Sequence, residues 1–202
     1  NFLRNLKVTT SDNQPTLAGI LFFGKKTEEF IGYAKITAAY IPGEDLSTPP
    51  ADKKDLSKRI PEVISDTISF LRLYLKEKHE IKGFEPELYP EVPENVLREG
   101  IVNAIAHRDY TIAAPIRLFI FDDRVEIRTP GRLPNTVTVE SMRLGTHVLR
   151  NPTIYNFLNK IGMVTDIGSG IPRMIRIMKE QFNRDVGLSV MENEFILTIP
   201  RK

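Results

Sequence analysis

The sequence predicts an α+β fold, a sandwich in which helices cover one face of a mostly antiparallel sheet. Three observations lead to this prediction. Apolar residues recur at helical spacing in long segments, short segments of alternating apolar and polar residues come in pairs, and the chain order is helix, helix, hairpin, long loop, helix, helix, hairpin. Apolar residues make up 41% and charged residues 27% of the 202 residues, which is typical of a globular protein.

A small α/β segment is expected before this sandwich. Thr16 can cap a helix that begins at Leu17 and stops at Gly24, and a strand is expected over residues 34–41. Prolines and charged residues then predict a loop. We therefore place a linker at residues 49–56, between a first unit at 1–48 and a second unit at 57–202.

The second unit begins with two helices. Helical spacing predicts one over residues 57–78 and another from Pro93 to about 107–110, and the Asp122-Asp123 pair predicts a tight turn between two strands. Glycines and prolines make residues 130–152 an irregular connection. The other expected elements are strands at 116–122 and 124–128, a short helix at 138–143, helices at 152–161 and 170–182, and strands at 187–191 and 194–199.

Charge and composition limit the classes of partner. The net charge is +2, but the stretch from Arg124 to Arg184 holds ten Lys or Arg against four Asp or Glu. This excess favours a triphosphate or a nucleic-acid backbone, and a merely solvated basic surface is the alternative. There is no cysteine, which fits a reducing, cytoplasmic setting. No apolar run approaches the ~20 residues that span a bilayer, so we expect no membrane partner.

Three polar residues at a spacing of four form the first candidate site. Glu99, Asn103 and His107 fall on one line along a predicted helix, among neighbours that are otherwise apolar. A carboxylate can orient and deprotonate a water molecule, and an amide oxygen suits a magnesium ion that carries phosphates. The alternative is a solvated helix edge.

Two glycine-containing turns form the second and third candidates. Gly168–Gly170 opens a predicted helix, where backbone N–H groups and the helix dipole can bind a phosphate, or where Ser169 is only an N-cap in a flexible turn. Thr129–Gly131 follows a predicted strand and could line a ligand, although hairpin ends often look the same. The chain holds no G-x-x-x-x-G-K-[ST] motif, since Gly24-Lys25-Lys26-Thr27 lacks the upstream glycine.

In this order the three motifs resemble the nucleotide-binding fold of gyrase, heat-shock chaperones, histidine kinases and MutL (GHKL). Glu99-x-x-x-Asn103 matches its N-box, and the two glycine turns stand where its two glycine boxes stand. The run from Leu97 to Tyr110, together with Arg150-Asn151-Pro152, is similar to the C-terminal domain of RecG-related, helicase-annotated proteins. The leader around Pro15–Gly19 looks like the end of a Schlafen AlbA-like domain.

The resemblance implies a Bergerat-type sandwich that binds ATP and Mg²⁺. It implies that Glu99 is the general base and that Asn103 is the magnesium ligand. Gly168 and Gly170 would cradle the phosphates under a lid formed by residues 132–167, from which Arg150 would reach a phosphate. The full set of implied nucleotide contacts is Asn103, His107, Thr129, Gly131, Arg150, Gly168, Ser169 and Gly170.

The sequence departs from the GHKL pattern at the first glycine box. Thr129 stands where the superfamily has an aspartate that reads the adenine amino group, and Arg132-Leu133 follows Gly131 where a second glycine is usual. A hydroxyl replaces at best one acceptor of that carboxylate.

Two functions remain open. One is an ATP-binding, weakly hydrolysing regulatory module of a transcriptional regulator, without a helicase motor of its own. The other is a degenerate, non-catalytic scaffold for homodimerisation or DNA association, with DNA bound by the basic surface or by residues before Asn1 in a longer protein. Glu99 and Asn103 favour the first function, whereas Thr129 favours the second.

For the first function we expect a lid that responds to the ligand. Residues 132–150 have few apolar contacts of their own, so they should be poorly ordered alone and ordered by a triphosphate. The expected positive charges of this lid are Arg132, Arg143, His147 and Arg150.

Overall fold

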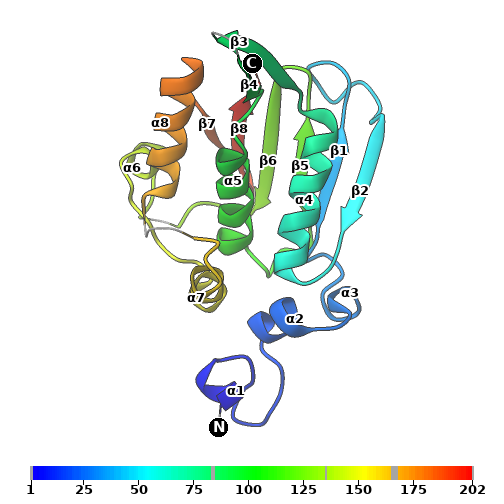
Figure 1. Cartoon of the computed structure of the whole chain (residues 1–202). Coiled ribbons are helices and arrows are strands. Elements are labelled where there is room, and N and C mark those ends of the chain that lie inside the picture. The colour runs from blue at the N-terminus through cyan, green and yellow to red at the C-terminus, as the bar shows by residue number, and fades with distance from the viewer. Residues whose placement is uncertain (1, 83–84, 135, 165–167, 202) are drawn as a thin grey trace.

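A six-stranded sheet with helices layered against it forms the body of the molecule (Figure 1). The computed structural model describes residues 2–82, 85–134, 136–164 and 168–201. The sheet order is β2-β1-β5-β6-β8-β7; only β1 and β5 pair in parallel, and all other neighbours are antiparallel. These strands are β1 (Ile36–Tyr40), β2 (Asp52–Leu56), β5 (Ile116–Ile120), β6 (Arg124–Pro130), β7 (Gly187–Met191) and β8 (Glu194–Pro200). The predicted α+β sandwich is confirmed.

Three long helices lie side by side in front of the sheet in Figure 1. They are α4 (Ile60–Tyr74), α5 (Glu94–His107) and α8 (Gly170–Phe182). The shorter helices are α1 (Phe2–Asn5), α2 (Leu17–Phe23), α3 (Thr27–Phe30), α6 (Val139–Arg143) and α7 (Pro152–Lys160). Within the described part of the chain, no helix is both long enough and apolar enough to cross a membrane.

A glycine brings the central helix α5 close to the sheet. A Cβ atom at Gly100 would lie 2.8 Å from Leu197 Cδ2 and 3.0 Å from Ile127 Cδ1, which is closer than Cβ contacts in proteins. Val96 and Ile101 of the same helix are fully buried in the core. The apolar face of α5 therefore rests on β6 and β8, and its polar edge lies just above the sheet.

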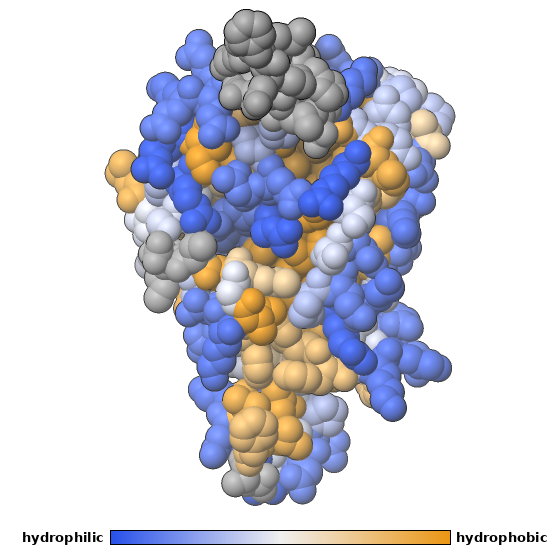
Figure 2. Space-filling view, in the orientation of Figure 1, coloured by the Kyte–Doolittle hydropathy of each residue, from blue (hydrophilic) through white to orange (hydrophobic). Residues whose placement is uncertain are grey.

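The N-terminal segment has the predicted helix and packs against α7. Thr16 Oγ1 accepts a hydrogen bond from Gly19 N (3.1 Å), which confirms the expected cap of α2. The ring of Phe157 in α7 lies 5.0 Å from that of Phe22 and 5.6 Å from that of Phe23. Figure 2 shows hydrophobic side chains gathered at this lower end of the molecule, where Phe2, Leu3 and Phe23 are exposed.

Within the range 49–56, where we expected a linker, residues 52–56 form strand β2. Asp55 in β2 accepts hydrogen bonds from Lys35 Nζ (2.5 Å) and Thr37 Oγ1 (2.7 Å) on the β1 side. Charged side chains suit an edge strand because they discourage pairing with another chain, so the charge run that suggested a loop is compatible with a strand. The sheet thus includes residues on both sides of the predicted boundary.

Two further elements differ from the expectation. The helix predicted over 57–78 ends at Tyr74, and an unpredicted hairpin follows, formed by β3 (Glu77–Lys82) and β4 (Glu85–Pro90). In sequence, β3 contains only one apolar residue, so it gives no alternating pattern. Strand β6 continues to Pro130, so Thr129 lies within the sheet opposite Phe195 instead of in a turn.

Candidate functional site

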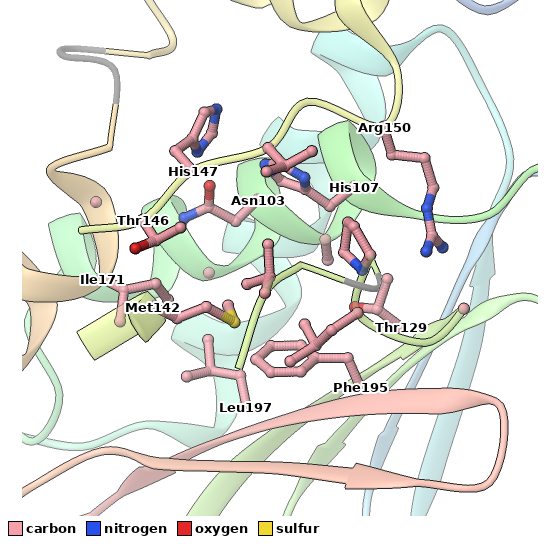
Figure 3. Close-up of a pocket in the computed structure, with 18 of the residues that line it drawn as sticks. Asn103, His107, Thr129, Met142, Thr146, His147, Arg150, Ile171, Phe195 and Leu197 are labelled. Carbon is pink, nitrogen blue, oxygen red and sulfur yellow. The ribbon is translucent and has the colours of Figure 1, made fainter. Parts of the chain in front are cut away.

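A cavity opens between α5, the sheet and the segment that connects β6 to α7 (Figure 3). Its empty volume is about 970 Å³, and this figure includes solvent-filled space at the open mouth. Its polar lining comprises Glu99, Asn103, His107, Thr129, Arg132, Thr146, His147 and Arg150, and its apolar lining includes Ile127, Met142, Ile171, Phe195 and Leu197.

The polar row on α5 forms one wall of this cavity. Asn103 Nδ2 donates a hydrogen bond to Glu99 Oε1 (3.1 Å), and His107 continues the row one turn further. Glu99 is buried, and its carboxylate forms an ion pair with the guanidinium of Arg173 in α8. The expected alignment is confirmed, whereas the arginine partner was not foreseen because 74 residues separate it from Glu99.

The Gly168–Gly170 turn lies directly against Glu99 and Asn103. A Cβ atom at Gly170 would overlap Glu99 Oε1 and lie 3.2 Å from Asn103 Nδ2. Gly168 has a φ of +81°, a left-handed conformation that favours glycine. The start of α8 is thereby brought to the polar edge of α5, and both motifs line the same cavity. Ser169 occupies the N-cap position of α8 without a side-chain capping hydrogen bond.

The first glycine turn makes room for Arg150. Gly131 has a φ of +116°, and a Cβ atom there would overlap the Arg150 guanidinium. Arg150 donates a hydrogen bond to the Arg132 carbonyl oxygen, and its Nη1 lies 3.7 Å from Asp109 Oδ2. Thr129, immediately before this turn, is buried and lines the cavity.

Two histidines meet at the same cavity. The ring centroids of His107 and His147 are 5.0 Å apart, with the ring planes at 89°. Burial lowers the pKa of His107 to about 4, helped by the nearby His147 and Arg150, and burial also lowers the pKa of His147. Burial thus favours the neutral form of both imidazoles, so any positive charge that His147 contributes depends on a neighbouring anion.

Two other arginines of the predicted lid, Arg132 and Arg143, bind partners outside the lid. Arg143 binds Asp185 Oδ2 (2.9 Å) and the Val186 carbonyl oxygen (2.8 Å), which directs its charge to the α8–β7 connection. Arg132 Nε donates to the Glu192 carbonyl oxygen (2.5 Å). A Cβ atom at Gly168 would lie 2.8 Å from the carbonyl oxygen of Gly145, so the lid backbone sits on the second glycine turn. Residues 135 and 165–167 of the predicted lid lie outside the described residues.

Two further motif residues, Asn151 and Arg108, hold the C-terminal end of α5 in place. Asn151 Nδ2 donates to the carbonyl oxygens of Ala106 (3.0 Å) and Arg108 (2.8 Å), which satisfies the C-terminal end of α5 beside His107. Arg108 is almost fully buried; it donates to the Tyr33 carbonyl oxygen (2.8 Å) and lies 5.0 Å from the centroid of the Tyr110 ring. Neither role is visible in the sequence, because charged and amide side chains are usually exposed.

Comparisons with known proteins agree with this geometry over part of the chain. Residues 113–199 match the family model described as "Putative ATP-dependent DNA helicase recG C-terminal". This region, which is less than half of the chain, is therefore similar to that family. It contains both glycine turns but begins after Glu99 and Asn103. A search of the curated proteins finds no match.

A solved structure shares the fold of nearly the whole chain. The crystal structure of the DIP2311 protein from Corynebacterium diphtheriae superposes with a TM-score of 0.84 at 21% sequence identity, over 98% of this chain and 40% of that one. The present chain thus spans less than half the length of this structural relative. The AlbA-like character of the leader stays a prediction.

Proposed function

We propose that this chain is an ATP-binding module that takes its nucleotide with Mg²⁺ in the cavity over α5. One observation carries the proposal: Gly170 lies so close to Glu99 and Asn103 that no side chain would fit between them. Because both motifs also line the same cavity, a phosphate and a magnesium ion bound there would lie within reach of both. The match of residues 113–199 to an HATPase-like family supports it.

The residues present fit a magnesium-bound triphosphate. The N-terminus of the 13-residue helix α8 would offer backbone N–H groups and a positive dipole end to the phosphates. Because the Asn103 amide nitrogen donates to Glu99, its carbonyl oxygen is the atom that would meet a magnesium ion. Arg150 lines the cavity and would add charge from the lid.

We propose that hydrolysis is slow. Glu99 is the one carboxylate among the described cavity-lining residues, and it would act as general base. Its carboxylate already contacts the guanidinium of Arg173 and the amide of Asn103, so it must release one of these partners before it can take a proton from a water molecule. A slowly hydrolysing site suits regulation, in which the nucleotide orders the lid and alters contacts with another part of a larger protein, here a transcriptional regulator.

Recognition of adenine should be weaker than in GHKL proteins that have an aspartate at this position. Thr129 offers one buried hydroxyl, and the wall beside it is apolar, with Phe195 and Leu197. Stacking and burial of the base would then supply more affinity than hydrogen bonds to its edge. We therefore expect ATP and GTP to differ little in affinity.

Calorimetric titration with ATP in the presence and absence of Mg²⁺ tests the proposal. Asn103→Ala should weaken Mg²⁺-dependent binding by about 5- to 150-fold, which corresponds to the ~1–3 kcal/mol of a charge-linked hydrogen bond. Glu99→Gln should leave binding nearly unchanged and reduce hydrolysis. Asn95→Ala is the matched control, because Asn95 is an exposed asparagine of the same helix. Equal affinities of wild type and Asn103→Ala would contradict the assignment.

Two observations favour a second candidate function, a non-catalytic scaffold. Thr129 replaces the adenine-reading carboxylate, and Arg173 already neutralises Glu99. For this candidate we propose a homodimer or a DNA-associated module that uses its basic surface. Wild-type protein that binds no nucleotide with Mg²⁺, yet sediments as a dimer or binds DNA in a salt-dependent manner, would establish it in place of the first.

A further inference from the structure

The chain has three histidines, and two of them meet in the cavity. His107 comes from α5 and His147 from the lid, and their rings pack edge to face with centroids 5.0 Å apart. The second ring neighbour of His147 is Tyr155 in α7, at 5.3 Å. Figure 3 shows His147 and Asn103 at the same end of the cavity.

His147 has a buried polar atom that lacks a partner. Its Nε2 is inaccessible to solvent and makes no hydrogen bond. Buried polar atoms are nearly always hydrogen-bonded in folded proteins, so such an atom beside a cavity points to a ligand that completes it. The His147 side chain begins beside the second glycine turn, because a Cβ at Gly168 would lie 3.6 Å from His147 Cβ.

The groups that face the histidine pair favour an anion. Arg150 and His147 lie close enough to His107 to lower its pKa, and Arg132 lines the same cavity. Asn103 and Thr129 are neutral, and so is Tyr155 in α7. Two described carboxylates on and after α5 are already paired, Glu99 with Arg173 and Asp109 with Arg150. Among the described residues, neither histidine forms an ion pair with a carboxylate of its own.

We propose that His147 and His107 together bind the polyphosphate of the ligand, with His147 closing on it from the lid. The inference rests on the proposed nucleotide function and adds the residues that bind the polyphosphate of the nucleotide. Imidazole N–H groups donate to phosphate oxygens, and a bound polyanion favours the doubly protonated form of each ring. Binding therefore takes up protons from solution, which a site made of arginines and backbone N–H groups does not do.

Calorimetric titration tests the inference with two probes, inorganic tripolyphosphate and Mg²⁺–ATP. Each titration is run slightly below neutral pH in two buffers of different ionisation enthalpy, and the difference in heat gives the number of protons taken up on binding. Wild type should bind both probes with net proton uptake. His147→Gln and His107→Gln should each weaken both probes by about tenfold and reduce the uptake. The matched control is His79→Gln, which changes the third histidine, in β3, and should behave as wild type.

Imidazole nitrogen NMR of wild-type protein gives a readout that needs no variant. Tripolyphosphate should shift two of the three histidine signals toward the protonated form and leave the third in place. Two shifted signals support the inference even where a histidine variant folds poorly. Signals that all stay in place at saturating tripolyphosphate overturn it.

The outcomes separate this inference from the nucleotide function. If tripolyphosphate binds through His147 but Mg²⁺–ATP binds no more tightly than tripolyphosphate does, the nucleotide function fails and the histidine site stands. If ATP binds wild type and His147→Gln equally and without proton uptake, the histidine site fails and the nucleotide function stands. If neither probe binds, both fail.

Discussion

At the scale of residues, the site depends on the absence of a side chain at Gly170. The start of α8 touches the carboxylate of Glu99 and the amide of Asn103 only because position 170 has no Cβ. Gly131 has the same relation to Arg150. The glycines of the two turns are therefore required first by packing, and any phosphate binding builds on that close approach.

Gly170→Ala should disrupt the site. The added methyl group would overlap Glu99 Oε1, so either α8 or the carboxylate must move. Overpacking of this kind costs about 1–3 kcal/mol, and we expect at least about tenfold weaker ATP binding. Urea unfolding and calorimetry measure both effects. In the control Gly32→Ala the new Cβ would lie 3.3 Å from the Glu28 carbonyl oxygen, a tight contact without overlap, so the loss of stability should be smaller and ATP binding should stay near wild type.

The His107 pKa predicts an acid-sensitive stability. The folded chain keeps this imidazole neutral down to about pH 4, whereas the unfolded chain protonates it below about 6.5. The contribution of His107 is therefore complete above pH 6.5 and is lost as the pH falls toward 4, by about 3 kcal/mol in all. Denaturant unfolding across this range should show a smaller loss for His107→Gln than for wild type. Parallel curves would contradict the buried, neutral imidazole.

At the scale of elements, the lid between β6 and α7 is held by few contacts. Its backbone rests on the second glycine turn at Gly145, and Arg143 ties it to Asp185. Arg150 anchors its C-terminal end over Gly131. An exposed ion pair such as Arg143–Asp185 contributes only about 0–1 kcal/mol, so the lid should open readily.

Hydrogen exchange should reveal this opening. Backbone amides of residues 136–150 should exchange faster in Arg143→Gln than in wild type, and saturating Mg²⁺–ATP should slow them in both proteins. Lys26→Gln removes a more exposed ion pair, that with Glu29 in the N-terminal segment, and serves as control. Exchange that is unchanged by ATP would refute the lid mechanism and favour the scaffold function.

The elements that periodicity could predict are those with one apolar and one polar face. The bounds of α8 and β7 match the expectation, and those of α7 and β8 differ by one residue, because their apolar residues follow a clear period. Strands β2 and β3 were not predicted, since charged side chains conceal their backbone pairing. For the site, spacing within α5 placed Glu99 and Asn103 correctly. The partners Arg173 and His147 depend on tertiary contacts that no local pattern encodes.

At the scale of the whole molecule, one sheet and one buried arginine unite the N-terminal segment with the rest. Strand β1 pairs in parallel with β5, and Arg108 at the end of α5 reaches back to the carbonyl oxygen of Tyr33. The structural relative shares the fold over 98% of this chain, N-terminal segment included. The site helix α5 is thus fixed at its C-terminal end by residues from the first part of the chain.

Arg108→Ala should destabilise the whole molecule. The guanidinium is buried and donates to the carbonyl oxygens of Tyr33 and Ala114, which would lose their partner. Each unsatisfied buried acceptor costs about 1–3 kcal/mol, so we expect a loss of several kcal/mol in urea unfolding. Arg176→Ala, at an exposed position of α8, is the control and should change stability by about 0.5 kcal/mol or less. A small loss for Arg108→Ala would show that water replaces the guanidinium.

The central claim is that Asn103 and the Gly168–Gly170 turn form one metal–phosphate site. Paramagnetic broadening by Mn²⁺, added with ATP in place of Mg²⁺, tests it most directly because the effect falls steeply with distance from the ion. The account predicts that the side-chain amide of Asn103 and the backbone amide of Gly170 lose their signals first, and only when ATP is present. The exposed Asn95 of the same helix should keep its signal longer. Broadening centred elsewhere, or independent of ATP, would contradict the account.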